Sequence, residues 1–170
     1  MISREELIQQ AYEKAFRYET ERGSCPRCVL AAIMETLQVG DPKTIQAADA
    51  LAGGTSLTTE GTCGALVGGL LAISSVLGRT YEDFSEGNRK RRVFSVSKQL
   101  YEQFKKEYGS ILCKDVHQKL FARTFNLLNA DNYAAFEKAG AHVDKCPEVS
   151  GMVARWTAQL LIERILEKNP

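Results

Sequence analysis

Cysteines are the residues of this sequence best suited to chemistry, and four of the five share one kind of position. Cys25, Cys63, Cys113 and Cys146 each stand where the residue pattern predicts the start of a helix. A helix N-terminus offers free backbone N–H groups and the positive end of the helix dipole, which stabilise a thiolate. Such positions lower a cysteine pKa from about 8.5 to about 3.5–7.5. If the four helix starts converge, they form a site of several reactive sulfurs.

Several chemistries suit such a site. Neighbouring thiolates support thiol–disulfide exchange, and the same sulfurs can hold zinc, another soft metal ion or an iron–sulfur cluster. The spacing does not decide among them, because the cysteines lie tens of residues apart, unlike the compact pairs of zinc fingers or the clustered cysteines of bacterial ferredoxins. Any shared site must therefore be assembled by the fold.

Three further residues stand near these cysteines. Cys28 completes a Cys-x-x-Cys motif with Cys25, as in thioredoxin, but the strand that precedes such a motif in thioredoxin is missing. Cys28 therefore either pairs with Cys25 or packs as a small apolar residue. His117 follows Cys113 by four residues and His142 precedes Cys146 by four, so each could be a base or a metal ligand one helical turn away. The alternative for both is an ordinary surface or core histidine.

A long stretch without charge forms the middle of the sequence, from Gly61 to Gly78. It predicts a buried central helix with Thr62 as N-cap and Cys63 in the first turn. Gly64 and Gly68 form a GxxxG pair that suits close helix packing, and we expect both to lie near a bound cofactor. Frequent Gly, Ser and Thr and the absence of a second hydrophobic segment favour this helix over a membrane span.

The remaining segments also have helical patterns. Ser3 and Glu6 fit a capping box that begins a helix reaching to about Arg22. Helical spacing or start signals predict further helices over residues 25–37, 41–50, 88–108 and 132–139 and from Cys146 onward, and a short helix or turn over residues 115–121. The sequence therefore predicts an all-α protein, a compact bundle of about six helices around the glycine-rich helix, as a single domain over residues 1–170.

These residues resemble a known family. Cys25 with Val29-Leu30, then Thr62-Cys63-Gly64-Ala65-Leu66-Val67-Gly68, then Cys113 and Cys146 are similar to the C-GCAxxG-C-C family of redox-active proteins. The resemblance implies a redox or cofactor-binding role for the four cysteines. A related domain occurs in split-Soret cytochromes, which implies that an iron–sulfur cluster is one option. Cys28 is an additional cysteine outside the family pattern.

Composition restricts the partners. Lysine and arginine together number 22 against 21 aspartates and glutamates, so no strong field attracts nucleic acid or an anionic membrane. The acidic, polar start of the chain lacks the features of a secretory signal, and we expect a cytoplasmic protein. A homodimer is compatible with a helical domain of this size, although no residue requires one.

Three hypotheses follow. In the first, the four cysteines exchange electrons with an unidentified redox partner by cycling between thiols and disulfides. In the second, the same four sulfurs hold an iron–sulfur cluster or zinc. In the third, the thiols only pack in an interaction domain. The sequence does not decide whether the protein is an enzyme.

Overall fold

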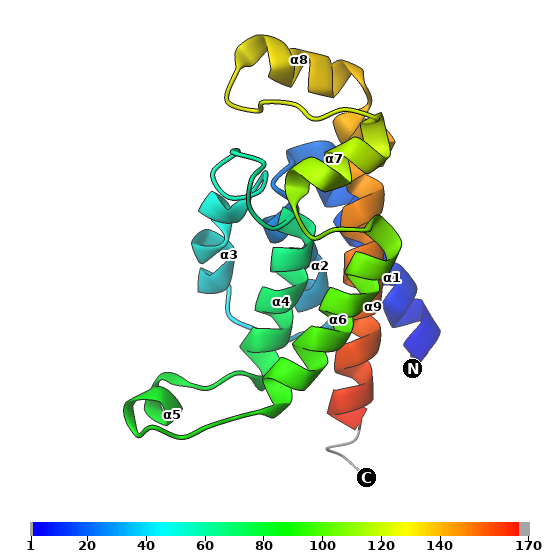
Figure 1. The fold of residues 1–170 in the computed structure, drawn as a ribbon. Helices are drawn as coiled ribbons and strands as arrows, with labels where there is room; N and C mark the ends of the chain where they lie inside the picture. The colour runs from blue at the N-terminus through cyan, green and yellow to red at the C-terminus, as the bar shows by residue number, and fades with distance from the viewer. Residues whose placement is uncertain (1, 167–170) are drawn as a thin grey trace.

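Helices joined by loops make up the computed structural model, which describes residues 2–166 (Figure 1). No β-strand forms within this range, so the prediction of an all-α protein is confirmed. The helices are α1 (Arg4–Arg22), α2 (Cys25–Leu37), α3 (Lys43–Ala47), α4 (Gly64–Leu77), α5 (Tyr81–Ser85), α6 (Arg92–Tyr108), α7 (Cys113–Phe121), α8 (Ala130–Lys138) and α9 (Cys146–Leu166). A 3₁₀ turn (Asp49–Leu51) and a π-helical turn (Ala141–Lys145) complete the chain order.

The number of helices exceeds the prediction of about six, since nine α-helices form among the described residues. The difference arises in polar segments that lack a long apolar stripe. In α5, for example, the side chains of Thr80 and Asp83 form a capping box with the backbone, and this local signal is sufficient for a short helix. Other boundaries shift by a few residues: α6 begins at Arg92 instead of residue 88, and α7 begins at Cys113 instead of residue 115.

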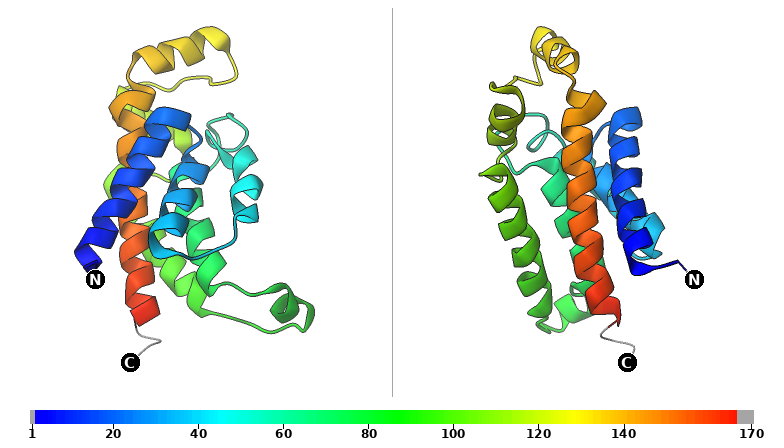
Figure 2. Two further views of the ribbon diagram at one scale, coloured as in Figure 1. Left: turned by 180° about the vertical axis from the view of Figure 1, so that it is seen from behind. Right: turned by 90° about the vertical axis from the view of Figure 1, so that its right-hand side faces the viewer.

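Two helices share the middle of the bundle. The glycine-rich helix α4 packs against α2, α6 and α9, while α9 packs against α1, α2, α4 and α6 (Figure 2). The long helix α9 is apolar around much of its circumference, and Val153, Ala154, Ala158 and Leu161 are all fully buried. The bundle is therefore organised around the α4–α9 pair, where the sequence predicted α4 alone.

Close packing of α2 on α4 depends on Gly68. A Cβ atom at this position would lie 2.5 Å from the carbonyl oxygen of Pro26 and 2.9 Å from Cβ of Val29. Both distances are shorter than van der Waals contact, so only glycine permits this approach. The predicted role of the GxxxG pair in helix packing agrees with this contact.

One end of the bundle collects the chain segments that carry the four cysteines. The C-terminal end of α1, the N-terminal ends of α2, α4 and α9, and the helices α7 and α8 lie together in the upper part of Figure 1. The loop that contains α5 projects at the opposite end. None of the helices among residues 2–166 combines the length and apolarity needed to span a bilayer.

Candidate functional site

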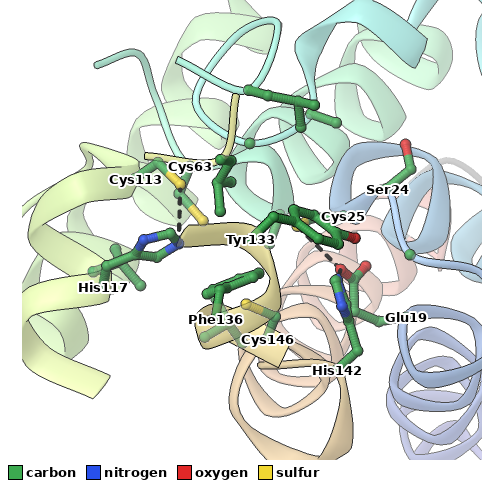
Figure 3. Close-up of a pocket in the computed structure, with 18 of the residues that line it drawn as sticks. Glu19, Ser24, Cys25, Cys63, Cys113, His117, Tyr133, Phe136, His142 and Cys146 are labelled. Carbon is green, nitrogen blue, oxygen red and sulfur yellow. Dashed lines mark hydrogen bonds and ion pairs between the residues drawn. The ribbon is translucent and has the colours of Figure 1, made fainter. Parts of the chain in front are cut away.

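A cavity of about 160 Å³ lies at this end of the bundle, and Cys25, Cys63, Cys113 and Cys146 all line it (Figure 3). The predicted convergence of the four cysteines is therefore confirmed, although their chemical role is a separate matter. Apolar and aromatic side chains form much of the remaining wall, together with the ionisable Glu19, Arg22, His117 and His142. The lining residues used below are Glu19, Leu57, His117, Tyr133, Phe136 and His142.

Each of the four cysteines stands at a helix start, as the sequence predicts. Cys25, Cys113 and Cys146 are the first residues of α2, α7 and α9. Cys63 is the N-cap of α4, so the prediction of Thr62 as N-cap was wrong by one residue. Thr62 instead pairs with Leu112 in an isolated antiparallel bridge, which holds its backbone extended and delays the helix.

The same bridge positions two of the cysteines. The backbone N–H of Cys63 donates to the carbonyl of Ile111 at 2.7 Å, and the N–H of Cys113 donates to the carbonyl of Gly61 at 3.0 Å. These two hydrogen bonds flank the Thr62–Leu112 pair. They bring the starts of α4 and α7 together although the two cysteines are fifty residues apart in the chain. Short pairings of this kind have no signature in a single sequence.

A π-helical turn positions the fourth cysteine. Residues 141–145 form this turn, which leads directly into α9 at Cys146. Gly140 precedes it with a φ of 88°, a left-handed conformation that glycine adopts without steric cost. The turn directs both His142 and Cys146 to the cavity. Single π turns are rare in proteins and frequent at functional sites.

A left-handed turn borders the cavity on the side of α2. Five consecutive residues, from Gly53 to Leu57, have φ angles between 50° and 69°. For residues other than glycine this conformation costs about 1–2 kcal/mol each. Backbone hydrogen bonds support the turn, among them Ser56 N–H to the carbonyl of Ala50 at 2.8 Å. Gly53 and Leu57 line the cavity, so this strained segment forms part of its wall.

Burial raises the pKa of each cavity thiol, contrary to the predicted thiolates. For Cys63 the raised value is about 11, because loss of hydration outweighs the hydrogen bonds from the backbone N–H groups of Ala65 and Leu66. The pKa of Cys25 and that of Cys146 are raised well above the usual value, by burial first and then by the Glu19 carboxylate. Helix N-termini lie at the cysteines as expected. Loss of hydration in the cavity, however, raises the pKa of the thiols by more than the helix N-termini lower it.

Glu19 is the residue that the sequence interpretation missed. Its side chain is 0% exposed, and burial raises its pKa. The Cys25 thiol donates a hydrogen bond to its Oε1 at 3.2 Å, and the Ser150 hydroxyl donates to its Oε2 at 3.3 Å. A signal was available: Glu19 follows the buried Ala11 and Ala15 at intervals of four, and so continues the apolar face of α1.

His117 lies beside Cys113, with Nε2 at 3.6 Å from the cysteine Sγ. The imidazole is 2% exposed and packs against the rings of Phe121, Phe125 and Phe136. Burial lowers its pKa to about 4, so the ring is neutral near pH 7. Its Nδ1 has no hydrogen-bond partner among the described residues. His117 therefore lies beside a thiol, as one interpretation of the sequence expects, and it is also a core histidine, as the alternative expects.

His142 contacts the cavity through Glu19 and not through a cysteine. Its Nε2 lies 3.6 Å from Oε1 of Glu19, and its Nδ1 lies 2.6 Å from Oε1 of Glu137. The side chains of His142 and Glu137 are 22% and 39% exposed, whereas that of Glu19 is 0% exposed. These three residues therefore lead from the buried cavity to solvent.

Three of the singled-out residues lie outside the cavity lining. The Cys28 thiol donates to the carbonyl of Gly23 at 3.0 Å and faces a different pocket, which Tyr18 and Arg27 help to form. Gly64 and Gly68 contact the first turns of α2, where a Cβ on Gly64 would lie 2.8 Å from Cδ of Pro26. The two glycines thus hold Cys25 and Cys63 close together without facing the space between them.

The four sulfurs are chemically the donor set that soft metal ions and iron–sulfur clusters take. The arrangement of the four cysteines does not match this donor chemistry. Within residues 2–166, no group of three or more His, Cys, Asp or Glu side chains is placed to hold a metal ion. The cysteines therefore share one cavity without forming such a group.

Comparison with known proteins gives one result. The family model described as "Putative redox-active protein (C_GCAxxG_C_C)" matches residues 24–160. Searches of curated proteins and of solved structures found no match. The matched range begins just before Cys25 and ends after Cys146, so it includes every helix start that carries a cavity cysteine.

Proposed function

Because the chain belongs to the C-GCAxxG-C-C family of redox-active proteins, we propose that it transfers electrons through the thiols of its cavity. The observation that carries this proposal is that Cys25, Cys63, Cys113 and Cys146 line one cavity although they come from four helices. Unrelated buried thiols would be distributed over the core, as Cys28 is. Gathering all four of the others at one end of the bundle serves a common reaction.

Oxidation of two thiols to a disulfide removes two electrons and two protons, so the site needs proton acceptors as well as sulfurs. Two acceptors are available. The Glu19 carboxylate accepts a hydrogen bond from the Cys25 thiol, and the neutral His117 ring lies beside Cys113. Each base is placed to take up a proton as its sulfur reacts.

Two cysteine pairs follow from the contacts that position the helix starts. The hydrogen bonds beside the Thr62–Leu112 bridge align Cys63 with Cys113. The other two cysteines begin α2 and α9, which both contact Glu19, through the Cys25 thiol and the Ser150 hydroxyl. We therefore assign Cys25 with Cys146 and Cys63 with Cys113 as the pairs that form disulfides. Each pair then contains one thiol with a neighbouring base.

A redox partner reaches the cavity between the left-handed turn and α8. Leu57 and Tyr133 both line the cavity, and they are 38% and 40% exposed. Cys63 and Cys113 are buried, whereas Cys25 and Cys146 are partly exposed. A small disulfide, or the exposed disulfide of a protein partner, is the class of oxidant that fits this entrance.

A second candidate, supported by the four-thiol donor set alone, is an iron–sulfur cluster or zinc on the same cysteines. It requires the side chains to move from their present arrangement, in which no three donors are placed to hold one ion. Iron, zinc and sulfide analysis of protein purified without oxygen separates the two candidates. Stoichiometric metal would replace the proposed dithiol chemistry.

The direct test compares two cysteine variants. Cys63→Ser should abolish reversible oxidation of the Cys63–Cys113 pair, because it removes a sulfur that the disulfide requires. Cys28→Ser is the matched control, since Cys28 lies outside the cavity lining, and it should leave the count of oxidisable thiol pairs unchanged. The count is read by mass spectrometry after mild oxidation. Equal oxidation of Cys63→Ser and the parent protein would reject the assignment.

A further inference from the structure

Glu19, His142 and Glu137 form a continuous polar chain from the cavity to the surface. The chain begins at the Cys25 thiol, which donates to Oε1 of Glu19 at 3.2 Å. The same Oε1 lies 3.6 Å from Nε2 of His142 (Figure 3). Nδ1 of His142 lies 2.6 Å from Oε1 of Glu137. Three different elements supply the groups: α1, the π-helical turn and α8. Glu137 and His142 are five residues apart in the chain, but only the fold brings them to Glu19.

The orientation of the imidazole suits transfer of a proton. The Glu137 carboxylate can only accept when it is ionised, so Nδ1 of His142 carries the hydrogen in that contact. In the neutral ring, Nε2 then presents its lone pair toward Glu19. A proton that arrives on Glu19 can pass to Nε2, while the hydrogen on Nδ1 is given up to Glu137. Glu137 is 39% exposed and can release it to water.

We propose that Glu19, His142 and Glu137 are the proton path that connects the buried Cys25 thiol with solvent. This inference rests on the proposed redox role of Cys25 but can be tested apart from it. Glu19 is the group that touches the reacting sulfur. His142 and Glu137 are positioning residues, which act through Glu19.

The reaction that the path serves balances as follows. Two cavity thiols and one external disulfide give one cavity disulfide and two external thiols. The S–H bond of Cys25 breaks, its proton moves to Glu19, and its sulfur bonds to one sulfur of the external disulfide as the other leaves. The second cavity cysteine then displaces the remaining external sulfur. Cys25 loses one proton through the path, and the second cavity thiol loses another. The two leaving thiolates take up two protons from water, so the protons balance.

Other groups around Glu19 cannot replace the path. Its remaining neighbours are thiols and hydroxyls, and none of them is a base near pH 7. These neighbours are Cys28, Cys63, Cys146, Ser150 and Tyr133. His142 is therefore the one imidazole that contacts Glu19 among the described residues.

The test measures how fast Cys25 reacts with a neutral haloacetamide, because alkylation also requires loss of the thiol proton but needs no redox partner. Trypsin cleaves after Arg22 and Arg27, so Cys25 is quantified on a peptide of its own, separate from Cys28. We expect His142→Ala to slow alkylation of Cys25 at pH 7 by about 10²-fold, the lower end of general-base effects, because Glu19 can then no longer pass its proton on. Added imidazole should restore much of the rate.

The matched control is Val143→Ala in the same π-helical turn. Val143 is 68% exposed and does not line the cavity, so its variant should react at the parental rate with no response to imidazole. A parental rate in His142→Ala, or a slow rate that imidazole fails to raise, would overturn the proton path. If His142→Ala does not fold, the surface variant Glu137→Gln replaces it, and alkylation at the parental rate in that variant likewise overturns the path.

Failure of the proposed function has a different signature. In that case the parent protein forms no cavity disulfide on mild oxidation, whatever the alkylation rates show. Slower alkylation in His142→Ala with rescue by imidazole would then still establish the proton path to Cys25.

Discussion

Individual sulfur atoms in this cavity experience two opposed effects. The backbone N–H groups at the start of α4 lower the pKa of Cys63, and burial raises it by more, to about 11. A reactive cysteine in an open, electropositive position would have the reverse balance. The chemistry of the site therefore depends on neighbouring bases and not on preformed thiolates, and Glu19 and His117 are those bases.

The raised pKa predicts how Cys63 responds to pH. Its alkylation rate should increase about tenfold for each pH unit from 7 to 10 without a plateau, because the thiolate fraction keeps growing below a pKa of about 11. The measurement is the rate constant for a neutral haloacetamide, read on the peptide that contains Cys63, with a short unfolded peptide as control. A plateau of the rate above about pH 8.5, the pKa of a free cysteine, would show that burial does not raise the pKa of Cys63.

His117 predicts a loss of stability in acid. Its pKa is lowered from 6.5 to about 4, so between these values the unfolded chain binds the proton and the native protein does not. The free energy of unfolding should therefore fall by up to about 3 kcal/mol as the pH falls from about 6.5 to 4. His117→Phe, which fits among the surrounding phenylalanine rings, should lack this contribution.

The check on His117 is urea denaturation of both proteins at pH 7 and at pH 5. Glu19 and every other acidic residue are present in both proteins. The difference between their changes in free energy of unfolding therefore gives the contribution of the His117 imidazole. An equal response of His117→Phe and the parent protein to pH would show that His117 is protonated in the native state.

Helix starts are the elements that build the site, and each is fixed by a different local device. An antiparallel bridge aligns the starts of α4 and α7, a π-helical turn introduces α9, and close packing on Gly68 holds α2 against α4. Loosening any one of these contacts would separate the sulfurs. The contact at Gly68 is the most direct to test because a single methyl group disturbs it.

Gly68→Ala should destabilise the protein. The added Cβ would lie 2.5 Å from the Pro26 carbonyl oxygen, and overpacking of this kind costs about 1–3 kcal/mol, against about 1 kcal/mol gained from helix propensity. Ser74→Ala is the control, since Ser74 is exposed on the same helix and should change stability by less than about 0.5 kcal/mol. Urea denaturation measures both, and equal stabilities would show that α2 and α4 are not in close contact.

Much of this arrangement could be predicted from the sequence. Periodicity and capping signals indicated an all-helical chain, and the four cysteines were correctly expected at helix starts and in one place. Residue spacing did not reveal the ionisation of the thiols, because burial is a property of the assembled cavity. Nor did it reveal Glu19, whose position on the apolar face of α1 was visible but whose contact with Cys25 required the fold.

The two ends of the whole molecule differ in character. The cysteine cavity occupies one end, and the loop with α5 projects from the other (Figure 1). This loop carries the exposed aromatic residues Tyr81 and Phe84, and its ion pair between Lys90 and Asp83 is internal. The loop therefore contributes little to the geometry of the cavity.

Replacing residues 80–91 by a short Gly-Ser linker should leave the redox chemistry unchanged. The loop lies on the surface and contacts mainly itself, and shortening such a segment has a small effect on stability. The number of thiol pairs oxidised and their rate of oxidation, compared with the parent protein, test this independence. Loss of oxidation in a variant that keeps its helical circular dichroism would show that the two ends are coupled.

The central claim is that the cavity cysteines exchange electrons as thiol pairs, and the most direct measurement is disulfide mapping on protein purified without oxygen. The sample is titrated with a small disulfide and analysed for free thiols, linked peptides, iron, zinc and sulfide. We predict that thiols disappear two at a time, that Cys25–Cys146 and Cys63–Cys113 peptides are linked, and that a reductant reverses both links. Stoichiometric metal in the sample, or the absence of any link among these four cysteines, would contradict the account.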